Sequence, residues 1–159
     1  MDLIYSKEET PLGTGGALKL AQVKLRKDHV LVMNGDSLVD FDYHSFFSWH
    51  INGGNDVTLL LSWMEDPSRY GAIEIDKNSK VVSFVEKSTK TIQGFINAGI
   101  YLMRTESFRQ FPQVARFSLE KDFFPSMVDH GLYGFRNTNR VRDIGTPEAY
   151  KNFLVQHEN

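Results

Sequence analysis

Apolar runs of strand length alternate with segments of helical spacing along the first 64 residues. The runs His29–Met33 and Asp56–Met64 are almost continuously apolar, which is typical of strands buried on both faces of a sheet. Between them, Asp42 is placed to cap a helix that runs from Tyr43 to about Ile51 and ends at a glycine pair. This alternation predicts parallel pairing of the strands, joined by right-handed crossovers.

The flanking segments extend the same pattern. Leu3–Ser6 has the pattern of a short strand, and the glycine-rich turn Gly13–Gly16 precedes a helix expected over Ala17–Arg26. In the second half, Ser118 is placed to cap a helix to about His130 that Pro125 bends or splits, and Thr146 to cap a last helix. The further strands expected are residues 71–76, 80–86, 95–103, 132–136 and 140–144. We therefore expect an α/β fold, three layers around a mixed sheet, in one domain over residues 1–159.

Composition then narrows the function. A chain of 159 residues with 41% hydrophobic and 24% charged residues has the profile of a globular domain rather than a disordered one. A net charge of −2 provides no basic excess for nucleic acid. The absence of cysteine excludes disulfides, thiolate zinc sites and cysteine nucleophiles, and no apolar run is long enough to span a membrane. We expect a cytoplasmic protein that binds neither nucleic acid nor membrane.

The segment Leu12–Leu18 reads LGTGGAL, a glycine-rich loop that opens a helix. Its backbone N–H groups would lie at the positive end of the helix dipole, and its glycines would let a flat ligand approach the backbone. It is not a Walker loop, because no Gly-Lys-Ser/Thr follows, nor a dinucleotide fingerprint, whose third glycine would fall at Leu18. Taken alone, the segment fits a ligand loop and a tight turn equally well.

Two aspartates follow or end predicted strands. Asp36 comes after the apolar run 29–33, and Asp143 ends the strand before the last helix. Ligands bind open α/β sheets at the carboxyl edge of the strands, and carboxylates there suit Mg²⁺, which shares hard oxygen donors with substrate phosphates. The two residues could share one metal ion, or each could hold a turn through its side chain.

Other polar residues lie at or within later strands. Glu86 and Lys87 could bind sugar hydroxyls and a phosphate, or form a solvated surface pair. Asn97 lies in an apolar strand, where Asn is depleted, so its amide is expected to have a partner, either a ligand or a neighbouring backbone group. Gly71 marks either the close approach of a ligand or a strand start.

The order of these motifs closely resembles the sugar-1-phosphate nucleotidyltransferases. Leu-Gly-Thr-Gly-Gly-Ala, Asn-Gly-Asp, Arg-Tyr-Gly, Glu-Lys, Asn-Ala-Gly-Ile-Tyr and Asp-Ile-Gly-Thr-Pro follow one another in that family's order, between about Leu3 and Leu154. Pro11–Leu18 and Phe117–Asp122 most resemble the guanylyltransferases for mannose 1-phosphate and D-glycero-D-manno-heptose 1-phosphate. The resemblance implies the Rossmann-like mixed sheet of the nucleotide-diphospho-sugar transferases.

The resemblance also implies a reaction. A nucleotidyl group, GMP from GTP by the nearer likeness, would pass from a nucleoside triphosphate to a sugar 1-phosphate with release of pyrophosphate. Asp36 and Asp143 would hold Mg²⁺, and Lys87 would bind the sugar phosphate. The implied substrate-binding residues are Gly71, Glu86, Asn97 and Gly99, and the implied nucleotide-binding residues are Gly13, Thr14 and Gly15.

One family signature is absent from these 159 residues. Relatives begin with a strand and a Gly-x-Gly-Thr-Arg loop followed by Pro-Lys, which cradles the triphosphate. We therefore expect an N-terminally truncated domain with little activity of its own, because loss of cationic contacts to a phosphoryl group costs several orders of magnitude. The alternatives are a non-catalytic sugar-nucleotide-binding or regulatory subunit, and an enzyme completed by a separate N-terminal segment or by another copy in a homo-oligomer. Base and sugar stay open.

Overall fold

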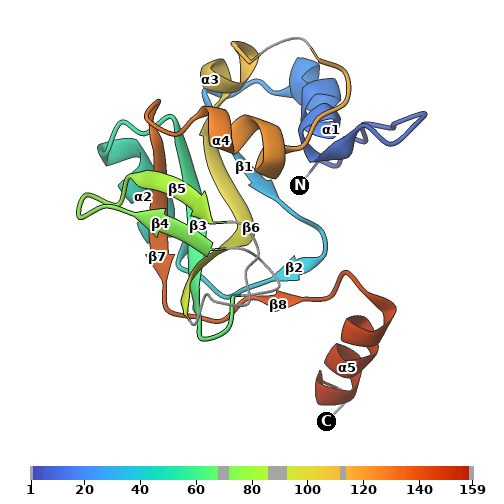
Figure 1. Ribbon diagram of the computed structural model, residues 1–159. Coiled ribbons are helices and arrows are strands. Elements are labelled where there is room, and N and C mark those ends of the chain that lie inside the picture. The colour runs from blue at the N-terminus through green and yellow to red at the C-terminus, as the bar shows by residue number, and fades with distance from the viewer. Residues whose placement is uncertain (1, 68–71, 86–92, 112–113, 158–159) are drawn as a thin grey trace.

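The computed structural model describes residues 2–67, 72–85, 93–111 and 114–157 (Figure 1). Its strands are β1 (His29–Met33), β2 (Ser37–Leu38), β3 (Val57–Met64), β4 (Ala72–Ile75), β5 (Val81–Val85), β6 (Gly94–Arg104), β7 (Leu132–Asn137) and β8 (Arg142–Asp143). Its helical elements are α1 (Gly13–Ala21), η1 (Gln22–Lys24), α2 (Tyr43–Asn52), α3 (Thr105–Arg109), η2 (Leu119–Phe123), α4 (Phe124–Ser126) and α5 (Pro147–His157).

Strand β6 organises the six-stranded sheet. β1 and β3 run antiparallel to it on its two edges, β7 is parallel to β3, and the β4–β5 hairpin joins near the start of β6. Because β1 and β3 both oppose β6, they share a direction, but they are not hydrogen-bonded neighbours. The expectation that these two strands pair directly was therefore wrong. The alternation of strand and helix indicates strand direction, but it does not show that a later strand inserts between two earlier ones.

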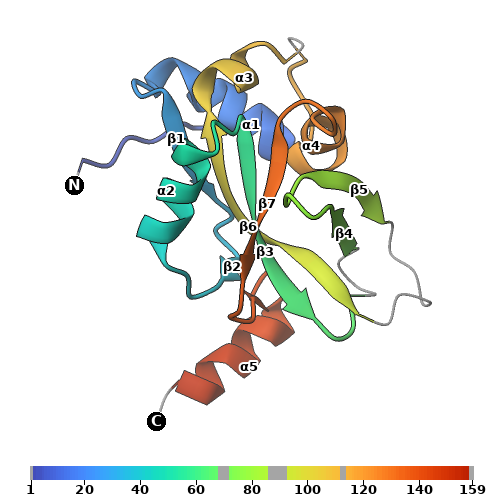
Figure 2. The same ribbon diagram turned by 90° about the vertical axis from the view of Figure 1, so that its left-hand side faces the viewer.

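The mixed sheet separates two hydrophobic layers, so the three-layer α/β expectation is confirmed. On one face, Phe46 of α2 packs against Leu60, Ile100 and Leu102. On the other face, residues of α3, η2 and α4 pack against the alternate side chains of the same strands, and Leu18 of α1 adds to them. Figure 2 shows α2 on the opposite side of the sheet from α1 and α4. Since adjacent strand residues point to opposite faces, β3 supplies both cores and is buried from Val57 to Ser62.

Strand β1 departs from the expected burial on both faces. Four of its five residues are half-buried and Met33 is 55% exposed. Within the described residues, β1 pairs only with β6, so no strand there covers its outer edge. The expectation failed because an apolar run predicts only that a strand suits the interior of a sheet. How far the strand is buried depends on whether a second strand pairs with its other edge.

Other differences are local. Residues Leu3–Ser6 form no strand, and Tyr5 is 81% exposed. The helix expected from Ser118 to about His130 ends at Ser126, and Asp129 then turns the chain with φ of 68°; Pro125 lies in α4, just after η2 ends at Phe123. No helix among the described residues has the length and hydropathy needed to cross a bilayer. The three predicted caps are confirmed: the side chains of Asp42, Ser118 and Thr146 accept N–H hydrogen bonds from the helices that follow them.

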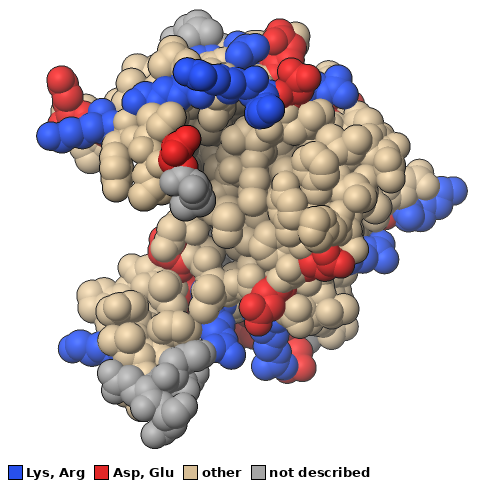
Figure 3. All heavy atoms as spheres, turned by 180° about the vertical axis from the view of Figure 1, so that it is seen from behind, with Lys and Arg blue, Asp and Glu red and all other residues tan. Residues whose placement is uncertain are grey.

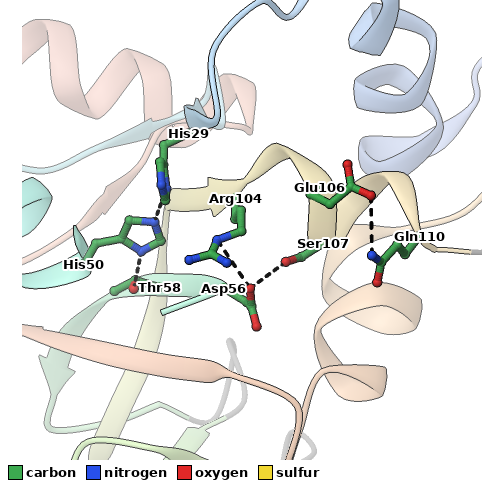
Figure 4. A network of polar contacts seen from close by, with 8 residues as sticks. All are labelled: His29, His50, Asp56, Thr58, Arg104, Glu106, Ser107 and Gln110. Atoms are coloured by element: carbon green, nitrogen blue, oxygen red, sulfur yellow. Dashed lines mark hydrogen bonds and ion pairs between the residues drawn. The ribbon is translucent and has the colours of Figure 1, made fainter. Parts of the chain in front are cut away.

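A network of polar side chains lies at the end of the sheet where β1 and β3 begin (Figure 4). His50 of α2 is fully buried, with its Nε2 2.9 Å from Nδ1 of His29 and its Nδ1 2.8 Å from Oγ1 of Thr58. Burial, together with the positive charge that His29 and Arg104 place nearby, lowers the pKa of His50 from 6.5 to about 4. The buried imidazole is therefore neutral at pH 7.

Candidate active site

Asp36 and Asp143 are brought together by the short antiparallel pair β2–β8. Ser37 pairs with Asp143, and the Ile144 N–H donates to the backbone oxygen of Asp36 at 2.9 Å. Both aspartates are exposed and flank Gly145. A Cβ on Gly145 would lie 3.0 Å from Oδ2 of Asp36 and 3.1 Å from Oδ1 of Asp143, so both carboxylates border the same small space.

This pair has the chemistry of a Mg²⁺ site that a substrate completes. Oδ1 of Asp143 accepts the Gly145 N–H at 2.8 Å, which fixes the orientation of that carboxylate. No group of three or more His, Cys, Asp or Glu side chains suitable for a metal occurs in the described part of the chain. Mg²⁺ commonly takes one or two carboxylates and draws its remaining ligands from phosphates and water, so the residues present fit the ion.

The glycine-rich loop packs tightly against the segment before η2. Helix α1 begins at Gly13, four residues earlier than expected, because Gly15 and Gly16 donate their N–H groups to the Phe117 oxygen at 3.1 and 3.2 Å. A Cβ on Gly15 would lie 2.2 Å from the Phe117 ring, and Gly13 has a φ of +77°. Close packing and backbone conformation thus account for these glycines here, and nucleotide contact by Gly13, Thr14 and Gly15 stays a prediction.

Asn97 and Gly99 lie in the part of β6 where its pairing register with β3 shifts. The Gly99 N–H donates to Oδ1 of Asn97 at 2.8 Å, and the Asn34 N–H donates to the Gly99 oxygen, also at 2.8 Å. Gly99 has a φ of +76°, and a Cβ there would lie 2.7 Å from Oγ of Ser37. The expected partner of the Asn97 amide is thus a backbone group and, as described below, a tyrosine. Contact with a sugar by either residue stays a prediction.

A pocket of about 630 Å³ lies between α1 and the end of β1, a size that suits a nucleotide or sugar nucleotide. Thr14, Leu18, Val32, Asn34 and Asp36 are among the residues that line it. Figure 3 shows this side of the molecule hollowed between the part that carries α1 and the part that carries α5. Most of the pocket wall is apolar. Asp36 lines the pocket and also belongs to the carboxylate pair, so the pocket and the pair adjoin each other.

Sequence reasoning missed two residues beside this pocket. The hydroxyl of Tyr101, which is 0% exposed, donates to Oε1 of Glu120 at 3.2 Å and accepts from Nδ2 of Asn97 at 2.9 Å. Burial and the Glu120 carboxylate raise the pKa of Tyr101. Both residues lie in segments that carry the family resemblance, Tyr101 at the end of Asn-Ala-Gly-Ile-Tyr and Glu120 within Phe117–Asp122, but neither pattern shows that the two side chains meet. Three other candidates, Gly71, Glu86 and Lys87, lie outside the described residues.

Comparisons with known proteins identify the family. The nucleotidyl transferase family profile matches residues 1–159. The chain is 35% identical over 153 residues to the mannose-1-phosphate guanylyltransferase of Mycobacterium tuberculosis, covering 94% of this chain and 43% of that protein. It is 37% identical over 148 residues to the D-glycero-alpha-D-manno-heptose 1-phosphate guanylyltransferase of Aneurinibacillus thermoaerophilus, covering 92% and 64%.

Solved structures give the same result. The crystal structure of HddC from Yersinia pseudotuberculosis superposes with a TM-score of 0.81 at 32% identity, over 94% of this chain and 64% of that one. A second structure of HddC, in complex with GMP-PN, has a TM-score of 0.79. The chain thus spans between two fifths and two thirds of the length of these relatives. With the whole of its sequence matched by the family profile, the chain belongs to the nucleotidyl transferase family.

Proposed function

We propose that the protein transfers a guanylyl group from GTP to a sugar 1-phosphate of the mannose or manno-heptose type, giving a GDP-sugar and pyrophosphate. One observation carries the proposal: Asp36 and Asp143 converge at Gly145, at the margin of a pocket large enough for a nucleotide. The choice of guanine and of these sugars is supported by the names of the relatives and by the GMP-PN complex of HddC.

In this reaction an oxygen of the sugar phosphate attacks the α-phosphorus of GTP, and the bond to pyrophosphate breaks. Asp36 and Asp143 would hold Mg²⁺, which when bound neutralises charge on the phosphates and orients them. The chain's contribution is position. The β2–β8 pairing fixes the two carboxylates, the Gly145 N–H orients Asp143, and the apolar wall of the pocket limits water around the nucleoside.

The sugar side of the proposal rests on fewer described residues. Asn97 is held in place by its bonds to Gly99 and Tyr101, which leave its amide a second N–H and a second lone pair for a sugar hydroxyl. Lys87 and Glu86 are assigned to the sugar phosphate and the sugar hydroxyls from the motif alone.

Titration calorimetry tests the proposal. With Mg²⁺ present, we expect GDP-mannose or the GDP-heptose to bind at least about tenfold more tightly than UDP-glucose, ADP-glucose or dTDP-glucose. Equal affinity for all of these sugar nucleotides would contradict the assignment of base and sugar. Binding of none of them would contradict the proposed function as a whole.

A second candidate is a sugar-nucleotide-binding function that another segment must complete for catalysis. It is favoured by the outer edge of β1, which pairs with no strand among the described residues. Under this candidate the chain binds GDP-mannose but releases no pyrophosphate from GTP and mannose 1-phosphate. Normal turnover by the chain would exclude it.

A further inference from the structure

Three hydroxyl groups from different elements meet at the Glu120 carboxylate. Oε2 accepts the hydroxyls of Thr14 at 2.6 Å and Ser118 at 2.7 Å, and Oε1 accepts that of Tyr101 at 3.2 Å. An ionised carboxylate is an acceptor at both oxygens, so one side chain satisfies all three donors. Glu120 thereby connects the start of α1 and the first turn of η2 with the middle of β6.

The bond to β6 extends toward the proposed sugar side. Tyr101 is 0% exposed, and its hydroxyl accepts from Nδ2 of Asn97, so its own proton is directed to Glu120. Oδ1 of Asn97 accepts the Gly99 N–H, so both ends of the amide have fixed partners. Without the Tyr101 hydroxyl, the amide nitrogen of Asn97 would lose the contact that orients it.

The bond to α1 extends toward the proposed nucleotide side. The Leu119 N–H donates to Oγ1 of Thr14 at 2.9 Å, and the Thr14 hydroxyl donates to Glu120. Thr14 lines the pocket, and its two bonds anchor the first turn of α1 to η2. The glycine packing on Phe117 fixes the same turn from the other side.

We propose that Glu120 is a positioning residue that anchors both sides of the site, the nucleotide side through Thr14 and the sugar side through Tyr101 and Asn97. The inference rests on the proposed function and extends it. Glutamine is only a partial test of Glu120, because its amide oxygen can still accept the two hydroxyls that meet at Oε2, whereas its amide nitrogen cannot accept the Tyr101 proton; Glu120→Ala removes all three contacts.

Calorimetry with GDP and GDP-mannose, both with Mg²⁺, separates this role from a structural one. We expect Tyr101→Phe to weaken GDP-mannose binding about tenfold and GDP binding less than about twofold, because only the sugar side loses its anchor. Glu120→Ala is expected to weaken both, since it also releases Thr14. The matched control is Asp122→Ala: the Asp122 carboxylate accepts the Ser118 N–H in the same turn, and its loss should change both affinities less than about twofold.

Equal weakening of both ligands by Tyr101→Phe would overturn the inference, as would an effect of Asp122→Ala as large as that of Glu120→Ala. A second measurement needs no ligand. We expect the effects of Thr14→Val and Tyr101→Phe on the unfolding equilibrium constant to depart from additivity at least about threefold, and to become additive in the Glu120→Ala background. An additive cycle with Glu120 in place would also overturn the coupling. If the unmodified chain bound neither GDP nor GDP-mannose, the proposed function would be contradicted. The unfolding measurements would still show whether Glu120 links Thr14 to Tyr101.

Discussion

Acidification from pH 7 to pH 4 should destabilise the fold through His50, which is fully buried between α2 and β3. Its ring nitrogens lie 2.9 Å from His29 and 2.8 Å from Thr58, and the charges of Arg104 and His29 disfavour a proton on it (Figure 4). Protonation in the folded state therefore puts a positive charge in a buried site without a carboxylate in direct contact. In the unfolded chain the same imidazole protonates freely.

The magnitude follows from the two pKa values. His50 has a pKa of about 4 in the folded protein, against 6.5 in an unperturbed histidine. At ~1.4 kcal/mol for each pH unit between them, the neutral state contributes about 3 kcal/mol to stability. Because the folded pKa is lowered and the neutral form is the favoured one, this contribution is complete above pH 6.5 and is lost as the pH falls from 6.5 to 4.

The assay is urea unfolding of the unmodified chain and of His50→Gln at pH 7, 5.5 and 4. We expect His50→Gln to be the less stable protein at pH 7, because it loses buried hydrogen bonds, but to lose less stability on acidification. The gap between the two should narrow by about 3 kcal/mol at pH 4. His44→Gln, a substitution of an exposed histidine in the same helix, should keep the pH dependence of the unmodified chain. Parallel curves for His50→Gln and the unmodified chain would refute the reasoning.

Three other predictions concern the site and its surroundings. Gly145→Ala should weaken Mg²⁺-dependent GDP-mannose binding about tenfold in calorimetry, because its Cβ would press on both carboxylates, and unchanged Mg²⁺-dependent binding would contradict this arrangement. Gly15→Ala should lower the free energy of unfolding by ~1–3 kcal/mol in urea titrations, because the added Cβ would overpack against the Phe117 ring. An unchanged urea midpoint would disprove that packing. In a pyrophosphate-release assay with GTP and mannose 1-phosphate, the isolated chain should turn over less than about one-thousandth as fast as a full-length relative, and a comparable rate would show that it needs no further segment.

Local features of the fold could be predicted from the sequence where a single residue determines them. Asp42, Ser118 and Thr146 cap helices as expected, and β1 has the predicted bounds. The pairing of Asp36 with Asp143 was anticipated because both lie at strand ends, although the β2–β8 bridge that joins them has only two residues per strand and no distinct sequence pattern.

The features that the sequence did not predict depend on contacts between segments that lie far apart along the chain. The burial of β1 is set by which strands flank it, and an apolar run carries no information on that. Glycines of the LGTGGAL segment suggested an open ligand loop, whereas Gly15 is buried under Phe117, more than one hundred residues along the chain. Glu120 was missed for the same reason, since its partners Thr14 and Tyr101 come from two other elements.

The central claim is that Asp36 and Asp143 hold a divalent cation against the phosphates of a bound sugar nucleotide. The most direct test titrates the chain with GDP-mannose, first with Mg²⁺ and then with EDTA. Asp36→Asn and Asp143→Asn are measured beside a control, Asp40→Asn, which changes an exposed aspartate two residues after β2. The account predicts that the unmodified chain binds GDP-mannose tightly only when Mg²⁺ is present. Asp36→Asn and Asp143→Asn should each lose most of this affinity, and their remaining binding should be the same in Mg²⁺ and in EDTA. Asp40→Asn should bind as the unmodified chain does. Binding that is equally tight in EDTA, or Mg²⁺-dependent binding that survives both Asp36→Asn and Asp143→Asn, would contradict it.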